Sequence, residues 1–323
     1  MPRSFLPTLR DASLRYICVM DAGFSPPRVE SLVPMETNFD SLLTASQEYF
    51  YAKVVCDSLA PSGCRLTTME ARYPRFIHAE VMTHRVLSRN AASSRAIPVR
   101  KMIDQVREHP ALFTWWGKAQ KGMQAREELT ETERNGAIAD WLWGRDQAIE
   151  VAERLLVRGM HKQNINRALE PYAWITVILS ATTWDNFFRL RTHADAQPEL
   201  QSVARLMQTA YEDSVPQILA AGEWHTPYLQ PDEYILPLDQ RKAISTGRCA
   251  RVSYLTHAGT REIQADIDLH DRLKGGPESD PDEPGHWSPF EHIAEALSQP
   301  EQSGNFTGWR QYRKAFLSES GVK

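Results

Sequence analysis

The stretch CRLTTMEARYPRFIHAEVMTHRVLSRNAASSRAI, residues 64–97, combines a strand-like segment, a proline, a segment with helical spacing and a polar loop. Residues 64–73 form a short, threonine-rich segment, which predicts a strand. Pro74 suits the first position of a helix, and residues 75–88 continue as a predicted helix. Upstream, apolar residues at helical spacing predict an amphipathic helix over 38–60. The order helix, strand, helix and loop indicates an α/β fold with many helices.

Further elements are predicted downstream of this stretch. WITVILS (174–180) is an apolar, β-branched run typical of a buried strand, and DNFFRLR (185–191) predicts a short helix with Thr182 and Asp185 as a capping box. Pro198 opens a longer amphipathic helix. Its predicted inward face consists of Leu200, Val203, Leu206 or Met207, Ala210 and Val215.

Two more segments have distinct character. Residues 100–163 are charged and helix-prone, and we treat them as a helical insertion. In SPFE (288–291), the sequence favours a helix start with Ser288 as N-cap, Pro289 at the first position and Glu291 at the third. The predicted fold class is therefore α/β (α+β), with a mixed sheet flanked by helices and extra helical segments, in a single domain over 1–323.

Composition limits the class of protein. The chain has 323 residues, 42% of them hydrophobic and 24% charged, which is ordinary for a globular enzyme. No apolar run is long enough for a membrane span and no signal peptide is evident, so we expect a cytoplasmic protein without a membrane partner. Four cysteines at irregular spacing indicate reduced, mostly structural thiols.

Positive charge gathers in one segment. Residues 75–101 contain six basic side chains against one acidic residue, Glu80, although the chain has a formal net charge of −4. Within this segment, the glycine-free loop with Asn90, Ser93, Ser94 and Arg95 offers hydroxyl, N–H and guanidinium donors for a phosphate. It is neither a Walker A loop nor a Rossmann turn. Binding of a nucleic-acid polymer is the alternative, which the acidic remainder of the chain disfavours.

Other polar residues have two interpretations each. Glu80, His84 and Ser88 would form one stripe on the predicted helix, either facing a ligand or forming a solvated face. Arg189 and Arg191 follow a buried strand and either reach a cleft or make surface ion pairs; Arg167 has the same ambiguity. In HWSPFEH (286–292), the histidines and Glu291 could suggest a metal, but their spacing is not that of HExxH and we predict no metal.

The motifs resemble those of one known family. Thr83-His84-Arg85, then seven residues and Ser93, is similar to the RHR-x7-S signature of the flavin-dependent thymidylate synthases (ThyX). NRALEP, DNFFRLR and ADAQPEL are similar to the family's ARxxLP, NFLxLR and HAQxEI, and RCARVSY (248–254) and HWSPFEH to its AARVSY and HxSPFEH. In the family the last two precede the RHR motif, whereas here they follow it. The C-terminal segment 247–323 therefore carries them out of family order, with WRQYRK (309–314) as a faint echo of RQxxRHR.

The resemblance implies a ThyX-like fold, a homotetramer or other homo-oligomer, and a reaction. The family reduces FAD with NADPH and uses methylenetetrahydrofolate to convert dUMP to dTMP, with the flavin carrying the redox chemistry. Carried over to this sequence, the implied catalytic residues are Arg191 and Ser93. The implied FAD-binding residues are His84, Arg85, Asn186, Ser253, His286 and Ser288. The implied nucleotide-binding residues are Glu80, Ser93, Ser94, Arg95, Arg167 and Arg191.

Several positions depart from the family pattern. Thr83 replaces an arginine, Glu80 a glutamine, Ala91 a glutamate and Ala96 a tyrosine, while Asp195, Ser180 and Thr182 replace a histidine, an asparagine and an arginine. Exchanging an amide for an acceptor changes the hydrogen bonds a substrate must supply. The alternatives are therefore an enzyme that hydroxymethylates dUMP or acts on dCMP, and a protein that binds nucleotide or nucleic acid without catalysis.

Overall fold

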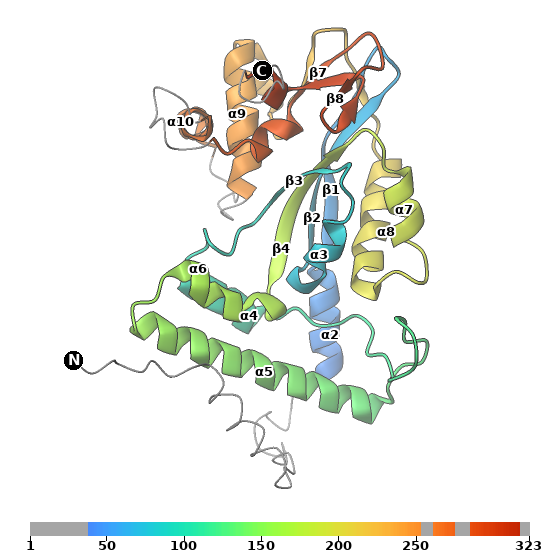
Figure 1. Cartoon of the computed structure of the whole chain (residues 1–323), viewed down its shortest axis with the longest axis vertical. Coiled ribbons are helices and arrows are strands. Elements are labelled where there is room, and N and C mark those ends of the chain that lie inside the picture. The colour runs from blue at the N-terminus through green and yellow to red at the C-terminus, as the bar shows by residue number, and fades with distance from the viewer. Residues whose placement is uncertain (1–37, 253–260, 275–284, 317–323) are drawn as a thin grey trace, which may run out of the picture. The chain divides into compact units, whose positions relative to one another are not determined.

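The computed structural model describes residues 38–252, 261–274 and 285–316, which belong to one compact unit, Asn38–Lys323. Its centre is a five-stranded sheet with the order β3-β4-β2-β1-β5 (Figure 1). All neighbouring strands are antiparallel except β1 and β5, so the sheet is mixed and the predicted α/β class is confirmed. The strands are β1 Tyr51–Leu59, β2 Arg65–Pro74, β3 Ser88–Ala91, β4 Trp174–Ala181 and β5 Gln217–Ile218.

The predicted helix over 38–60 is correct only in its first half. Helix α2 spans Phe39–Glu48 and is capped by Asn38, whose side chain accepts a hydrogen bond from Ser41 N. From Tyr51 the chain is strand β1, which pairs with β2 over its length. Apolar residues at helical spacing continue through 51–59, but pairing with β2 satisfies the backbone hydrogen bonds of these residues as a strand. This pairing outweighs the local helical pattern.

The predicted helix after Pro74 is also shorter than expected. Pro74 is the last residue of β2, and the short 3-10 helix η1 (Arg75–Ile77) and α3 (His78–Val81) follow. Ser88 already belongs to β3, which pairs with β4. The expected stripe of Glu80, His84 and Ser88 on one helix is therefore wrong, because α3 ends at Val81 and the chain joins the sheet as edge strand β3 a few residues later.

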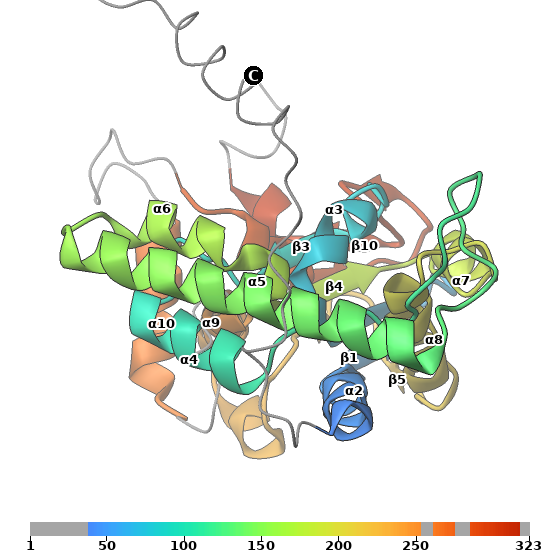
Figure 2. The ribbon, with the colours of Figure 1, turned by 90° about the horizontal axis from the view of Figure 1, so that it is seen from below.

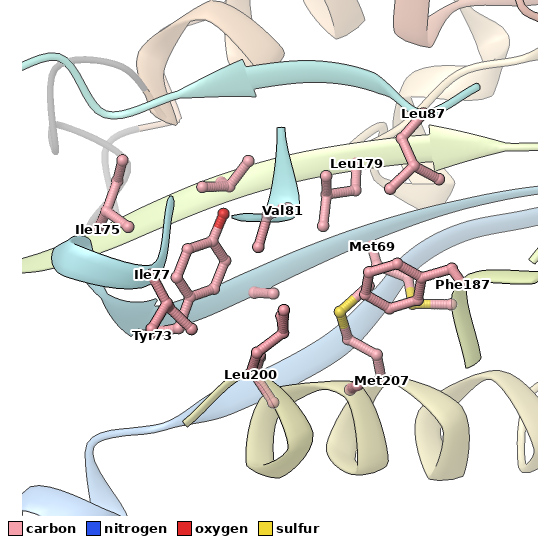
Figure 3. Packing of buried hydrophobic residues seen from close by; sticks show 14 of the residues in the cluster. Met69, Tyr73, Ile77, Val81, Leu87, Ile175, Leu179, Phe187, Leu200 and Met207 are labelled. Atoms are coloured by element: carbon pink, nitrogen blue, oxygen red, sulfur yellow. The ribbon is translucent and has the colours of Figure 1, made fainter. Parts of the chain in front are cut away.

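The main core lies between the sheet and two helices, α7 Asp185–Arg191 and α8 Pro198–Glu212. Both helices begin where the sequence predicted. In Figure 3, Met69 of β2 and Phe187 of α7 point toward Leu200 and Met207 of α8. Leu200, Val203 and Met207 are buried as predicted, whereas Leu206 is 41% and Val215 89% exposed.

The capping box predicted at Thr182 and Asp185 is absent. Trp184 is the N-cap of α7 and makes no side-chain capping bond. The Thr182 hydroxyl instead accepts a hydrogen bond from the backbone N–H of Thr307, 3.2 Å away. Thr182 therefore connects the end of β4 to a segment near the C-terminus.

Three helices form a separate group after β3. They are α4 Val99–Glu108, α5 Glu131–Val157 and α6 Lys162–Ile165, and Figure 2 shows α4 and α6 beside α5. Buried residues such as Ile103, Val106 and Ile149 form their common core. The turns η2 Asn166–Ala168 and η3 Glu170–Tyr172 then lead into β4. None of the helices within the described ranges is both long and apolar enough to cross a membrane.

The rest of the described chain packs against more than one part of the sheet: Phe306 and Trp309 share a core with Leu66 of β2, whereas Ile293 shares one with Ile178 of β4. Its elements are β6 Trp224–His225, η4 Pro231–Ile235, α9 Leu238–Arg251, α10 Ile263–Leu273, η6 Ser288–His292, β7 Ala294–Ala296, β8 Gln302–Ser303, β9 Phe306–Thr307, β10 Trp309–Gln311 and η7 Tyr312–Ala315. Strands β10, β7 and β6 form a second sheet, and β8 pairs with β9. Helix η6 contacts both β3 and β4.

A buried ion network joins α9, α10 and η4. The Arg248 guanidinium donates to both oxygens of Glu233, at 2.7 Å each, and its Nε donates to Asp266 at 2.9 Å. Glu233 and Asp266 are 2% and 0% exposed. At Gly247 a Cβ atom would lie 2.3 Å from the carbonyl oxygen of Asp266, so glycine permits this close approach of the two helices.

Candidate functional site

A cavity of about 450 Å³ lies where the loop after β3 meets α6 and η6. In Figure 1 the chain runs from β3 toward α4 and α6. The lining residues come from five segments of one chain, and none of those that the structure describes is a carboxylate: Asn90, Ala91, Ser93, Arg95, Ala96, His161, Gln163, Ala250, Leu273, His286, Ser288 and Pro289. The loop and the HWSPFEH segment thus meet within the same chain despite their unusual order.

Asn90 connects the loop to the C-terminal segment. Its side-chain nitrogen donates to Cys249 O at 2.8 Å, and its oxygen accepts from Ser288 Oγ at 3.4 Å. Gln311 Nε2 also donates to Ser88 Oγ, at 3.0 Å. The predicted N-cap role of Ser288 is wrong, because Trp287 holds that position and the Ser288 hydroxyl is directed to Asn90. This contact places Ser288 at the cavity.

The loop itself is held by side chains of α6 and η2. Asn166 Nδ2 donates to the carbonyl oxygens of Ser94 and Ile97, at 2.7 and 2.9 Å, and Lys162 Nζ donates to Ala96 O at 3.0 Å. Ser94 is buried, and its hydroxyl has no partner within the described residues. These bonds fix the loop without any glycine turn.

A second polar cluster lies at the other end of β3. Arg191 Nε donates to His84 Nε2 at 2.7 Å, and Arg191 Nη2 donates to Thr83 Oγ1 at 3.0 Å. Burial, and then the positive charges of Arg191 and Arg89, lower the pKa of His84. Because His84 Nε2 accepts the hydrogen bond from Arg191, the neutral ring carries its proton on Nδ1. Burial raises the pKa of Glu80, although the charge of Arg191 acts in the opposite direction.

The other predicted site residues that the structure describes lie in neither group. Arg85 is exposed, and Asn186 Oδ1 accepts a hydrogen bond from Arg189 at 2.8 Å. Arg189 is thus occupied locally, and Arg191 is the arginine of α7 that meets the polar cluster. Arg167 is exposed and pairs with Glu170 at 2.9 Å. Ser253 lies outside the described residues.

A buried hydrogen-bond chain, which no sequence motif indicated, attaches η6 to the sheet. His292 Nδ1 is 2.8 Å from Ser180 Oγ, Ser180 Oγ is 2.6 Å from Thr68 Oγ1, and Thr68 Oγ1 is 2.8 Å from His225 Nε2. All four side chains are fully buried. Ser180, at a position where the resemblance implies an asparagine, therefore positions η6 and with it Ser288.

The histidines of HWSPFEH do not form a metal centre with Glu291. His292 bonds Ser180, His286 lines the cavity, and Glu291 accepts a hydrogen bond from Arg313. In the part of the chain that the structure describes, no three His, Cys, Asp or Glu side chains gather in a metal-binding group.

We expect Ser180→Ala to destabilise the protein by about 1–3 kcal/mol, because it leaves the Thr68 hydroxyl and His292 Nδ1 with one partner fewer in a buried place. Urea unfolding measures this. Ser202→Ala is the control, since in the described part of the chain that hydroxyl donates only to Pro198 O, within α8. Equal stability of the two variants would contradict the role of the chain.

The protein should lose stability as the pH falls below about 6.5. Burial lowers the pKa of both His225 and His292 to about 3, and for His292 the neighbouring His225 adds to the effect. The unfolded chain takes up protons near pH 6.5 and the folded chain does not, so each histidine costs about 1.4 kcal/mol per pH unit below that value. Urea unfolding at pH 7.5, 6.5 and 5.5 measures the slope, which should be smaller in His292→Gln.

Comparison with known proteins gives one family match in sequence. The family model described as thymidylate synthase complementing protein matches residues 64–217. A search of the curated proteins finds no match. Among solved structures, the UMP/dUMP methylase PolB from Streptomyces cacaoi bound with 5-Br UMP is 17% identical, with 50% of this chain and 88% of that chain covered and a TM-score of 0.42. Thymidylate Synthase X (ThyX) from Helicobacter pylori with FAD and dUMP is 18% identical, with 45% and 67% covered and a TM-score of 0.32.

Proposed function

Because residues 64–217 match the family model described as thymidylate synthase complementing protein, we propose that the chain transfers a one-carbon unit to C5 of a deoxypyrimidine monophosphate. The simplest reaction is conversion of dUMP to dTMP with FAD, NADPH and methylenetetrahydrofolate. The observation that carries the proposal is the cavity in which Ser93 and Arg95 meet His286 and Ser288.

The donor set of this cavity suits a nucleotide phosphate. Arg95 and the Ser93 hydroxyl make no side-chain hydrogen bond or ion pair within the described residues, so both are available to a ligand. A guanidinium binds phosphate oxygens with two parallel bonds, and within the described ranges the lining holds no carboxylate that would oppose the anion. The volume of about 450 Å³ lies in the usual range for small-molecule sites.

The residues also fit an extended cofactor. Predicted FAD ligands lie at both ends of β3: His84 precedes the strand, whereas His286 and Ser288 line the cavity beyond it. Four strand residues extend about 13 Å, which suits a dinucleotide better than a compact ligand. Bound FAD would supply the hydride chemistry, and this chain would hold and orient it. Asn186 and Arg85 would reach it from the exposed surface near His84.

Arg191 is the proposed electrostatic catalyst. Its guanidinium is fixed by His84 and Thr83, and it retains N–H groups beyond these two bonds. Such a fixed cation stabilises negative charge that develops on a pyrimidine ring. The positive charge of Arg191 acts on the pKa of Glu80, and Glu80 would contact the nucleotide from α3. Ser94 and Arg167 remain proposed nucleotide ligands, and a homo-oligomer remains a prediction.

Product analysis tests the proposed function. We expect purified protein to show a flavin absorption band that NADPH bleaches and dUMP alters, and to form dTMP when methylenetetrahydrofolate is added. Mass spectrometry of the nucleotide identifies the product. A hydroxymethyl product, or turnover of dCMP without dUMP, would replace thymidylate synthesis by a related reaction. A colourless preparation that does not bind added FAD would refute the flavin mechanism.

A further inference from the structure

Two residues at the start of α6 line the cavity and have no part in the proposed function so far. His161 is the N-cap of α6 and Gln163 lies in its first turn, and both face the cavity that Arg95 lines. We propose that His161 and Gln163 bind the phosphate monoester of the nucleotide together with Arg95. This inference rests on the proposed function, because it names the substrate group that the same cavity recognises.

The local structure determines which nitrogen of His161 is available. The backbone N–H of Gln163 donates to His161 Nδ1 at 3.3 Å, so Nδ1 is an acceptor and the neutral ring carries its proton on Nε2. No partner of Nε2 occurs among the described residues. Capping the short helix α6 thus fixes the ring as a donor at the edge of the cavity.

The composition of the lining favours an anion with several acceptor oxygens. The side chains of Ala91 and Ala96 contribute only methyl groups, and none of the lining residues that the structure describes is Asp or Glu. The Gln163 side chain, like that of Arg95, makes no hydrogen bond within the described ranges, so it can offer its amide N–H groups. A phosphate monoester presents enough acceptors for an imidazole, an amide and a guanidinium at once.

The elements that carry these donors are tied together. Lys162, between His161 and Gln163, donates to Ala96 O at 3.0 Å, and Asn166 donates to Ser94 O at 2.7 Å. His161 and Arg95 therefore keep their relative position without a ligand. Such preorganisation reduces the entropy that binding must lose.

Binding measurements on the full-length protein with FAD test the proposal. The variants are His161→Asn, which retains an acceptor for the N-cap bond, and Gln163→Met, which retains the size of the side chain. His193→Asn is the matched control, because His193 Nδ1 accepts the backbone N–H two residues on, from Asp195 at 3.2 Å, without lining the cavity. Calorimetry measures dissociation constants for dUMP, deoxyuridine and inorganic phosphate.

We expect His161→Asn to weaken the binding of dUMP and of inorganic phosphate about tenfold, as for loss of a hydrogen bond to a charged group. Deoxyuridine affinity, the melting temperature and kcat at saturating dUMP should stay within twofold or a few degrees of the original protein. Gln163→Met should act in the same direction, and His193→Asn should change none of these values.

The outcomes separate this inference from the proposed function. Turnover of dUMP with an unchanged KM in His161→Asn and Gln163→Met would overturn the phosphate site and leave the function intact. An equal loss of deoxyuridine affinity would also overturn it. Phosphate binding that depends on His161, without any turnover of a pyrimidine nucleotide, would support the site and refute the function. Absence of both dUMP and phosphate binding would overturn both.

Discussion

Replacing Arg191 with alanine should lower kcat for nucleotide methylation by about a hundredfold to a thousandfold, the usual loss when a fixed donor to developing charge is removed. The arginine is held by His84 and Thr83, so its guanidinium is already oriented before substrate binds. Arg191→Lys should restore little, because an ammonium cannot make both bonds in a fixed plane. Steady-state kinetics with dUMP as the varied substrate measures the effect.

Arg189→Ala is the control for this prediction. Arg189 lies on the same helix and, among the residues that the structure describes, donates only to Asn186, so its loss should change kcat by less than threefold. The pKa of His84 gives a second readout that does not depend on turnover. The charge of Arg191 lowers this pKa, so NMR titration should find it higher in Arg191→Ala and unchanged in Arg189→Ala. Nearly full activity in Arg191→Ala would remove the arginine from the mechanism.

Arg248→Met should destabilise the protein by about 3–5 kcal/mol, because it leaves two buried carboxylates without their main partner. Arg248 pairs with Glu233 and Asp266, and all three side chains are almost fully buried. Methionine retains much of the volume, so the loss reports charge rather than a cavity. Chemical unfolding measures the change. Arg107→Met is the control, since Arg107 is half exposed and its ion pairs should contribute less than about 1 kcal/mol.

The same network has a pH dependence. Burial alone would raise the pKa of Glu233, but hydrogen bonds from Arg248, from the Gln230 backbone and from Arg261 bring it to about 2. Because the folded value lies below the unfolded one, the stabilisation is complete above about pH 4.5 and disappears as the pH falls toward 2. In Arg248→Met this acid-induced loss should be smaller. An unchanged acid profile would contradict the assignment to Glu233.

Local patterns predicted the elements that depend on their own residues. The strands near 64–73 and 174–180 and the helices at 185–191 and from Pro198 are confirmed, because apolar periodicity and proline position determine them. Strands β1 and β3 were missed. The four residues of β3, SRNA, have no strand propensity, and only the free edge of β4 makes them a strand.

The candidate site shows the same division. Motif resemblance pointed to Ser93, Arg95, His286 and Ser288, and the structure brings them to one cavity even though the chain order of their motifs is changed. His161 and Gln163 belong to no motif, and the local sequence does not indicate that α6 packs on the loop. The buried chain through Thr68, Ser180 and His292 is equally invisible, because hydroxyls and histidines that bond each other are distant in sequence.

The contact between Asn90 and Ser288 spans 198 positions of the chain. Closing so long a loop is slow and entropically costly, so contacts of this kind form late in folding. During synthesis the sheet and its helices can assemble while the HWSPFEH segment has not yet left the ribosome. A chain interrupted before this segment would retain much of the main core and lack one wall of the cavity, so synthesis of the HWSPFEH segment is the step that closes the cavity.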